Sequence, residues 1–252
     1  MTSILEVEEL RQSFGSIRAL DGASLRIERG ELVGMIGPNG AGKTTLFDCI
    51  SGIRTPDGGS VRFDGTEVTG AATHELARRG MVRTFQRTRE LATMTVGENM
   101  LLPTLDHPGE RAHHALFRTA AGASREREAR ERAAELLDLF DLDGMADAYA
   151  ATLSGGQRKL LELSRALMLD PSLLLLDEPF AGVNPTLTRD IAAHVRALND
   201  DGLTLLIIEH ELDTLTDLVD RLIVLTDGSV LTTGTPEEIL ADQRVIDAYL
   251  GN

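Results

Sequence analysis

The stretch Gly37-Pro38-Asn39-Gly40-Ala41-Gly42-Lys43-Thr44-Thr45 decides the fold of this chain. The apolar run Glu31–Ile36 before it predicts a buried strand, and Thr44–Ile50 after it predicts a helix. A Gly-x-x-x-x-Gly-Lys-Thr sequence between a strand and a helix is typical of a phosphate-binding loop. Backbone N–H groups and the positive end of the helix would surround the phosphate. Lys43 would reach the β- and γ-phosphates, and the Thr44 hydroxyl can bind Mg²⁺.

A second signal lies where a short apolar run meets two acidic residues. Leu173–Leu176 predicts a fully buried strand, and Asp177 and Glu178 follow it directly. Ligands bind at the carboxyl ends of the strands in open α/β sheets, so both carboxylates would face the phosphate loop. We expect Asp177 to hold Mg²⁺ through water, and Glu178 to orient and polarise the attacking water.

A third signal is Leu153-Ser154-Gly155-Gly156-Gln157 at the start of a predicted helix. Two glycines and a hydroxyl at a helix N-terminus can bind an anion. The simpler interpretation is an ordinary serine N-cap. A second phosphate-type site far from the first is unusual for one nucleotide. It makes sense if Ser154–Gln157 covers the γ-phosphate held by a second copy of the fold.

The order of predicted elements indicates one domain, residues 1–252, with a lobe inserted into it. Strands and turns fill the first third, and helices dominate from about Val96 to Ala150. The last third alternates helix and strand and carries a hairpin signal at Asp227-Gly228. We therefore expect a parallel α/β core made of residues 1–87 and 171–252. A helical lobe at roughly 88–170 would interrupt it.

Composition excludes several classes of protein. With 25 basic and 40 acidic residues the formal net charge is −15, which argues against a nucleic-acid partner. A high-GC genome and a salt-rich cytoplasm are two open explanations for this arginine-rich, acidic composition. Cys49 is the only cysteine, so no internal disulfide is expected and a reducing compartment is favoured. No apolar run is long enough to span a membrane, and Met1–Leu10 does not look like a secretory signal.

Together, the loop, the Leu-Ser-Gly-Gly-Gln pentapeptide and the acidic strand end resemble the ATP-binding subunit of ATP-binding-cassette (ABC) transporters. The resemblance implies a P-loop NTPase parallel-sheet core, an antiparallel β subdomain and an inserted helical signature subdomain. Phe14 resembles the aromatic residue that stacks on adenine. Gln86 resembles the hinge glutamine that touches Mg²⁺ and the water. His210 resembles the switch histidine that contacts the γ-phosphate.

Four stretches narrow the resemblance to the ATPases of branched-chain amino acid importers. They are Val82–Gln86, Met94–Asn99, Ala181–Pro185 and Ala248–Gly251. Urea and short-amide importer ATPases look nearly the same, and part of the chain also resembles the lipopolysaccharide-export ATPase. Asn184 departs from the common family pattern, where an aspartate stands, which leaves open how this turn bonds across a dimer.

The resemblance also implies partners. Two ATPase chains, either two copies or this chain and a similar one, would close on two ATP molecules. The resemblance favours the heteromeric pair. They would drive membrane permease subunits from the cytoplasmic face of the membrane, and a substrate-binding protein would act indirectly. The movement would pass through the segment Thr88–Asn99. Two other readings are a soluble cassette ATPase of DNA repair or translation and an ATP sensor that only binds.

Overall fold

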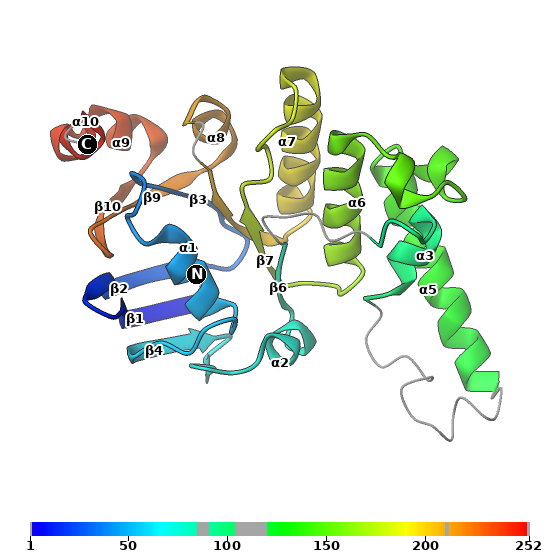
Figure 1. Cartoon of the computed structure of the whole chain (residues 1–252), viewed down its shortest axis with the longest axis horizontal. Coiled ribbons are helices and arrows are strands. Elements are labelled where there is room, and N and C mark those ends of the chain that lie inside the picture. The colour runs from blue at the N-terminus through cyan, green and yellow to red at the C-terminus, as the bar shows by residue number, and fades with distance from the viewer. Residues whose placement is uncertain (1, 85–90, 104–119, 210–211, 251–252) are drawn as a thin grey trace. The chain divides into compact units, whose positions relative to one another are not determined.

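A computed structural model describes residues 2–84, 91–103, 120–209 and 212–250 of the chain. The chain divides into two compact units (Figure 1). The first combines residues 1–86 with 171–252, and the second comprises residues 87–170. Among the described residues, no helix is long and apolar enough to cross a membrane.

The first unit contains a six-stranded sheet in the order β10-β9-β3-β8-β7-β6. Its strands are β3 (Leu32–Ile36), β6 (Met81–Arg83), β7 (Leu173–Asp177), β8 (Thr204–Ile208), β9 (Arg221–Thr226) and β10 (Ser229–Gly234). All adjacent pairs are parallel except β9–β10, the hairpin that Asp227-Gly228 predicts. The carboxyl ends of the five parallel strands therefore meet at one edge. The expected parallel α/β core is confirmed.

A four-stranded antiparallel sheet in the order β2-β1-β4-β5 completes the strands of this unit. Its members are β1 (Ser3–Phe14), β2 (Ile17–Glu28), β4 (Gly58–Phe63) and β5 (Thr66–Glu67). The antiparallel subdomain that the family resemblance implies is present.

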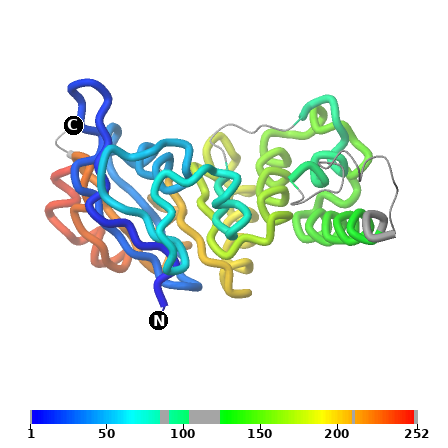
Figure 2. Tube along the Cα trace, turned by 90° about the horizontal axis from the view of Figure 1, so that it is seen from below, coloured from blue at the N-terminus to red at the C-terminus, as the bar shows by residue number. Residues whose placement is uncertain are grey.

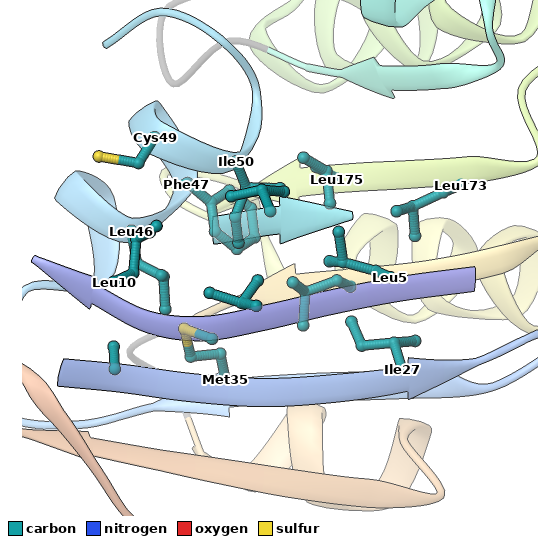
Figure 3. Close-up of a cluster of buried hydrophobic side chains, with 14 of the residues drawn as sticks. Leu5, Leu10, Ile27, Met35, Leu46, Phe47, Cys49, Ile50, Leu173 and Leu175 are labelled. Atoms are coloured by element: carbon teal, nitrogen blue, oxygen red, sulfur yellow. The ribbon is translucent and has the colours of Figure 1, made fainter. Parts of the chain in front are cut away.

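One hydrophobic core joins the two sheets through helix α1 (Lys43–Ile50). Alternate residues of a strand face opposite sides of its sheet, so Val33 and Met35 of β3 face this core, together with Leu46 and Phe47 of α1. Figure 3 shows Leu5, Leu10 and Ile27 of the antiparallel sheet gathered with Met35, Leu46 and Phe47. The core thus fixes the helix that begins at the phosphate loop.

The other face of the parallel sheet is also covered. A Cβ on Gly34 of β3 would lie 2.7 Å from Leu222 and 3.0 Å from Leu215 of α8, so helix and strand pack closely there. The remaining helices of this unit are α2 (Thr73–Arg78), α7 (Pro185–Asp200), α8 (Leu212–Leu218), α9 (Pro236–Ala241) and α10 (Gln243–Leu250). Strand β10 lies beside β2, so a strand from the last part of the chain packs against the antiparallel sheet formed by its first part (Figure 2).

The second unit is helical. It consists of α3 (Val96–Leu101), α5 (Ala120–Leu139), α6 (Gly155–Leu167) and the short 3₁₀ turns η2 (Asp143–Met145) and η3 (Ala150–Thr152). An apolar stripe on α5 and the residue after it is buried at Ala133, Leu136, Leu137 and Phe140. A cavity of about 400 Å³ lies between α3, α5 and η2, with Leu101 and Leu137 in its wall.

Candidate functional site

Two glycines of the phosphate loop are required by contacts with neighbouring backbone. Strand β3 ends at Ile36, and a Cβ on Gly37 would lie 2.1 Å from the carbonyl oxygen of Leu225. Gly42 is the N-cap of α1 and has a φ of 100°, and its Cβ would lie 2.3 Å from the carbonyl oxygen of Ala19. Only glycine fits either position, so the chain's packing fixes the shape of this loop.

Lys43, the first residue of α1, lies folded over the loop and is 5% exposed. Its Nζ donates hydrogen bonds to the carbonyl oxygens of Gly37 at 2.6 Å and Pro38 at 3.0 Å. Burial lowers the pKa of the Lys43 ammonium, and the nearby Glu178 carboxylate opposes that shift. The structure therefore brings Lys43 and Glu178, which lie far apart in the sequence, close enough for their charges to interact.

The rest of the loop is open to ligand. Asn39 and Gly40 are exposed, and so is Thr44 in the first turn of α1, while Thr45 is half-buried. Ala41 is buried, and its carbonyl oxygen accepts a hydrogen bond from the N–H of Gly228 at 3.1 Å. A rigid loop with exposed backbone at a helix N-terminus has the properties of an anion-binding site.

Asp177 is the last residue of β7, and its side chain is buried. One of its two carboxylate oxygens has a hydrogen-bond partner. Asp177 pairs in register with Ile208 of β8, which places it at the carboxyl edge of the sheet. Its Oδ2 accepts a hydrogen bond from Arg83 at 2.7 Å, whereas Oδ1 is buried with no hydrogen-bond partner among the described residues. A buried, unpaired carboxylate oxygen is costly unless a ligand completes it. Asp177 and the Thr44 hydroxyl therefore fit Mg²⁺, which commonly uses one or two carboxylates plus phosphate oxygens.

Glu178 has a backbone conformation rare for a residue with a side chain, with a φ of 50°. Its N–H donates to the carbonyl oxygen of Ile208 at 3.0 Å, and its own carbonyl accepts from Ala181. The buried Glu209 carboxylate accepts a hydrogen bond from the N–H of Phe180 at 2.7 Å. These bonds hold the turn after Asp177, and strained residues of this kind concentrate at functional sites.

Asn184 has a structural role within its own chain. It is the N-cap of α7, and its Oδ1 accepts hydrogen bonds from the N–H groups of Thr186 and Leu187, both at 3.1 Å. An aspartate could accept the same two bonds. The departure at this position therefore leaves the helix start intact.

Phe14 lies at the end of β1 and is 43% exposed, so it is not a core residue. The guanidinium of Arg54 lies 4.5 Å from the centre of its ring. An exposed aromatic ring held by a cation on one side can stack a base on the other.

In the second unit, Ser154 is the N-cap of α6 and forms a capping box with Gln157. Its Oγ accepts from the Gln157 N–H at 3.3 Å, and the Gln157 side chain accepts from the Ser154 N–H at 2.9 Å. The ordinary N-cap that the sequence allowed is thus present. Gly155 is exposed and Gly156 is buried. In the part of the chain that the structure describes, a Cβ on Gly155 would meet no atom outside its own helix within 4 Å, so packing against these residues does not require glycine there.

Two predicted site residues, Gln86 and His210, lie outside the described residues, as does the first part of the segment Thr88–Asn99. The described part of that segment leads into α3 through a capping box between Thr95 and Glu98.

Sequence reasoning missed three residues that shape the site. Gly228 links the β9–β10 turn to the phosphate loop and to the N–H of Asp21 in β2. Burial raises the pKa of the Tyr249 hydroxyl of α10, and the nearby Gly37 backbone of the phosphate loop opposes that shift. Arg83 holds Asp177. Arg83 and Tyr249 stood in the stretches that narrowed the family resemblance, but only the packing gives them a function.

This fold and loop define the class of P-loop nucleoside triphosphatases. The sequence profile of the ABC transporter family matches residues 20–181, and a profile described as "Branched-chain amino acid ATP-binding cassette transporter" matches residues 229–252. The chain belongs to the ABC transporter family as one of its ATP-binding, ATP-hydrolysing components.

Curated relatives match over nearly the whole length. A high-affinity branched-chain amino acid transport ATP-binding protein, BraF of Pseudomonas aeruginosa, is 43% identical and covers 98% of each chain. A probable branched-chain amino acid transport ATP-binding protein, LivG of Methanocaldococcus jannaschii, is 40% identical over 98% of this chain and 97% of that protein. The high-affinity branched-chain amino acid transport ATP-binding protein LivG of Escherichia coli K12 is 36% identical over 98% of both.

Solved structures match as well. The ADP conformation of an ATP-binding cassette of an ABC transporter has a TM-score of 0.86 and 39% identity, covering 100% of both chains. A dimeric post-hydrolysis cassette bound to ADP and Pi has a TM-score of 0.76 and 27% identity, covering 92% of this chain and 98% of that one.

Proposed function

We propose that this chain is the ATPase subunit that powers import of branched-chain amino acids through a membrane transporter. The observation that carries the proposal is the match of residues 229–252 to the branched-chain amino acid cassette profile. This segment includes β10 and α10, whose Tyr249 reaches the phosphate loop. The three full-length relatives named above carry the same substrate class in their names.

ATP would bind across the phosphate loop and Phe14. The adenine would stack on the exposed ring of Phe14, and the loop N–H groups from Gly37 to Thr45 would hold the phosphates. The Lys43 ammonium now contacts two loop carbonyls and would exchange them for β- and γ-phosphate oxygens. A partly desolvated ammonium gains more from a phosphate oxygen than from a neutral carbonyl, which favours this exchange.

Hydrolysis would use the residues at the carboxyl edge of the sheet. Glu178 would accept a hydrogen bond from the attacking water and polarise it, close to the Lys43 ammonium. Thr44, Gln86 and Asp177 would hold Mg²⁺, which neutralises developing charge on the phosphate oxygens. His210 would contact the γ-phosphate. Gln86 and His210 receive these roles from the family resemblance.

A second chain would complete each site. Ser154, Gly155, Gly156 and Gln157 of one protomer would cover the ATP held by the loop of its partner. The open space over Gly155 supports this, because a phosphate can approach the helix N-terminus closely there. In this proposal the unit of residues 87–170 is the signature subdomain. One of the dimeric cassettes similar to this chain holds ADP and Pi.

Permease subunits would receive the movement, which makes the ATPase a peripheral protein at the cytoplasmic face of the membrane. The cavity beside α3 suits a permease segment with apolar and basic side chains. Leu101 and Leu137 contribute apolar surface to its lining. Its charged lining residues are Glu98, Asp143, Asp147 and Arg130, so acidic side chains outnumber the basic one. A disulfide cross-link from Ala134→Cys in that wall to the permease tests this contact, and Glu135→Cys on the other face of α5 is the control. Equal cross-linking of both would refute it.

The function itself is tested by transport. The chain is copurified with its membrane partners and its substrate-binding protein, and uptake of leucine, urea and a short amide into vesicles is compared. We expect ATP-dependent uptake of leucine that is lost in Glu178→Gln. Uptake of urea or amide alone, or outward lipopolysaccharide transfer, would replace the proposed substrate. ATPase activity stimulated by DNA or ribosomes would indicate a soluble cassette protein instead.

A further inference from the structure

Arg83, the last residue of β6, is a buried cation that joins two acidic residues of the first unit. Its side chain is 6% exposed, and that of Asp177 is 0% exposed. Nη2 donates to Asp177 Oδ2 at 2.7 Å, and Nη1 donates to Asp48 Oδ1 at 2.7 Å. Asp48 belongs to α1, the helix that begins at the phosphate loop. Arg83 therefore ties the end of β7 to that helix.

Further contacts leave the Arg83 guanidinium little freedom. Nη1 also donates to Ser51 Oγ at 3.0 Å, and the guanidinium carbon lies 5.5 Å from the centre of the Phe47 ring. The planar fork of arginine suits several acceptors at fixed angles, which a lysine ammonium cannot match. A guanidinium fixed in this way fixes the carboxylate that it holds.

The pairing determines which oxygen of Asp177 remains available. Oδ2 is bound by Arg83, and Oδ1 is the buried oxygen without a partner among the described residues. The next residue of the β6 end contributes too, because the Asp177 N–H lies 3.5 Å from Thr84 Oγ1. Buried ion pairs are often no more stabilising than apolar packing, so a positional role is the better explanation of this one.

We propose that Arg83 is a positioning residue for the metal site: it fixes Asp177 so that Oδ1 faces the nucleotide-bound cation. The inference rests on the proposed role of Asp177 in holding Mg²⁺. Partners that orient a metal ligand typically change metal affinity or activity about 10- to 100-fold when they are mutated. Because Arg83 also binds Asp48 of α1, it holds the Asp177 carboxylate in a fixed position relative to α1 and the phosphate loop.

The test compares Arg83→Gln and Arg83→Lys with a matched arginine of the same unit. Arg221→Gln is the control, because Arg221 also binds a carboxylate twice, with Nε at 3.2 Å and Nη2 at 2.7 Å from Glu31 oxygens. Arg221 begins β9, at the opposite end of its strand from the carboxyl edge where Asp177 lies. Mn²⁺ is titrated into protein saturated with a non-hydrolysable ATP analogue, and free Mn²⁺ is measured from its electron paramagnetic resonance signal. Analogue affinity without metal is measured in EDTA.

We expect Arg83→Gln to weaken Mn²⁺ binding about 10- to 100-fold relative to Arg221→Gln, with metal-free analogue affinity unchanged. Arg83→Lys should restore part of the loss, since it keeps the charge without the fork. Equal Mn²⁺ affinity in Arg83→Gln and Arg221→Gln would overturn the inference. A wild-type protein that takes up no Mn²⁺ would refute the role of Asp177 as well.

A second variant covers the case in which Arg83→Gln does not fold, as judged by circular dichroism. Asp48→Asn removes the other carboxylate partner of Arg83 and leaves the Arg83–Asp177 pair in place. We expect a smaller loss of Mn²⁺ affinity, about 10-fold, the low end of the range for such partners. Unchanged affinity in a folded Asp48→Asn protein would overturn the inference.

Discussion

Replacing Gly155 with alanine should have opposite effects on two properties. It should stabilise the single chain and weaken the ATP-dependent dimer. Gly155 is the first residue of α6, after the Ser154 cap. An added Cβ would have no neighbour within 4 Å among the described residues, and the backbone is not in the left-handed region. Alanine therefore fits the isolated chain without strain.

The size of both effects can be estimated from this geometry. A glycine-to-alanine change at a compatible position stabilises a protein by about 0.4–1 kcal/mol, chiefly by restricting the unfolded chain. For a chain of this size that raises Tm by about 1–4 °C. If Gly155 lies against a phosphate held by a second chain, the methyl group blocks that approach. Losing one hydrogen bond to a charged group costs about 1.5–3 kcal/mol, or about 10- to 150-fold in dimer affinity.

The assay measures both quantities in one protein. Thermal unfolding without nucleotide reports the single chain, and light scattering with ATP reports the dimer, in a Glu178→Gln background that slows hydrolysis. Gly144→Ala is the matched control, because Gly144 lies in the same unit and also has open space around it. Dimer formation by Gly155→Ala at the same protein concentration as Gly144→Ala would refute the shared site. A lower Tm would refute the packing argument.

Three further predictions concern the first unit. Glu178→Gln should retain ATP binding and lose turnover by about 10²- to 10⁴-fold, so that an ATP-bound dimer accumulates on size-exclusion chromatography; undiminished turnover would exclude Glu178 as the residue that activates water. Gly42→Ala should cost about 1–3 kcal/mol in urea unfolding and abolish ATP binding, because its Cβ meets the Ala19 carbonyl at 2.3 Å; normal ATP binding would contradict this. Burial raises the pKa of Cys49 from 9.0 to about 11, so iodoacetamide at pH 8 should alkylate the folded chain about 100-fold more slowly than the urea-unfolded chain. The raised pKa contributes stability below pH 9, and that contribution is lost as the pH rises towards 11; equal alkylation rates would show that the thiol is not buried.

Much of the fold could be predicted because its signals are local. The apolar run before Gly37 became β3, and the Asp227-Gly228 turn became the β9–β10 hairpin. Short elements were missed, among them β6, which has only three residues. A three-residue strand has too little periodicity to identify, and β6 exists because β7 pairs with it.

The candidate site, like the fold, was predictable only where its signals are local in the sequence. The phosphate loop and the acidic pair at the end of β7 could be predicted as site residues from residue type and spacing. The functions of Gly228, Tyr249 and Arg83 could not, because each depends on a contact between distant segments. The roles of Gln86 and His210 remain predictions.

The sequence by itself determined the chemistry that neighbouring residues can provide: a glycine-rich loop opening a helix, a capped helix at Ser154, and carboxylates at the end of a buried strand. Such features follow from backbone conformation and hydrogen bonds within a few residues. The tertiary structure alone decided that Glu178 lies near Lys43 and that Arg83 fixes one oxygen of Asp177. The order of strands in the sheet sets those contacts, and that order is chosen by burial of the whole core.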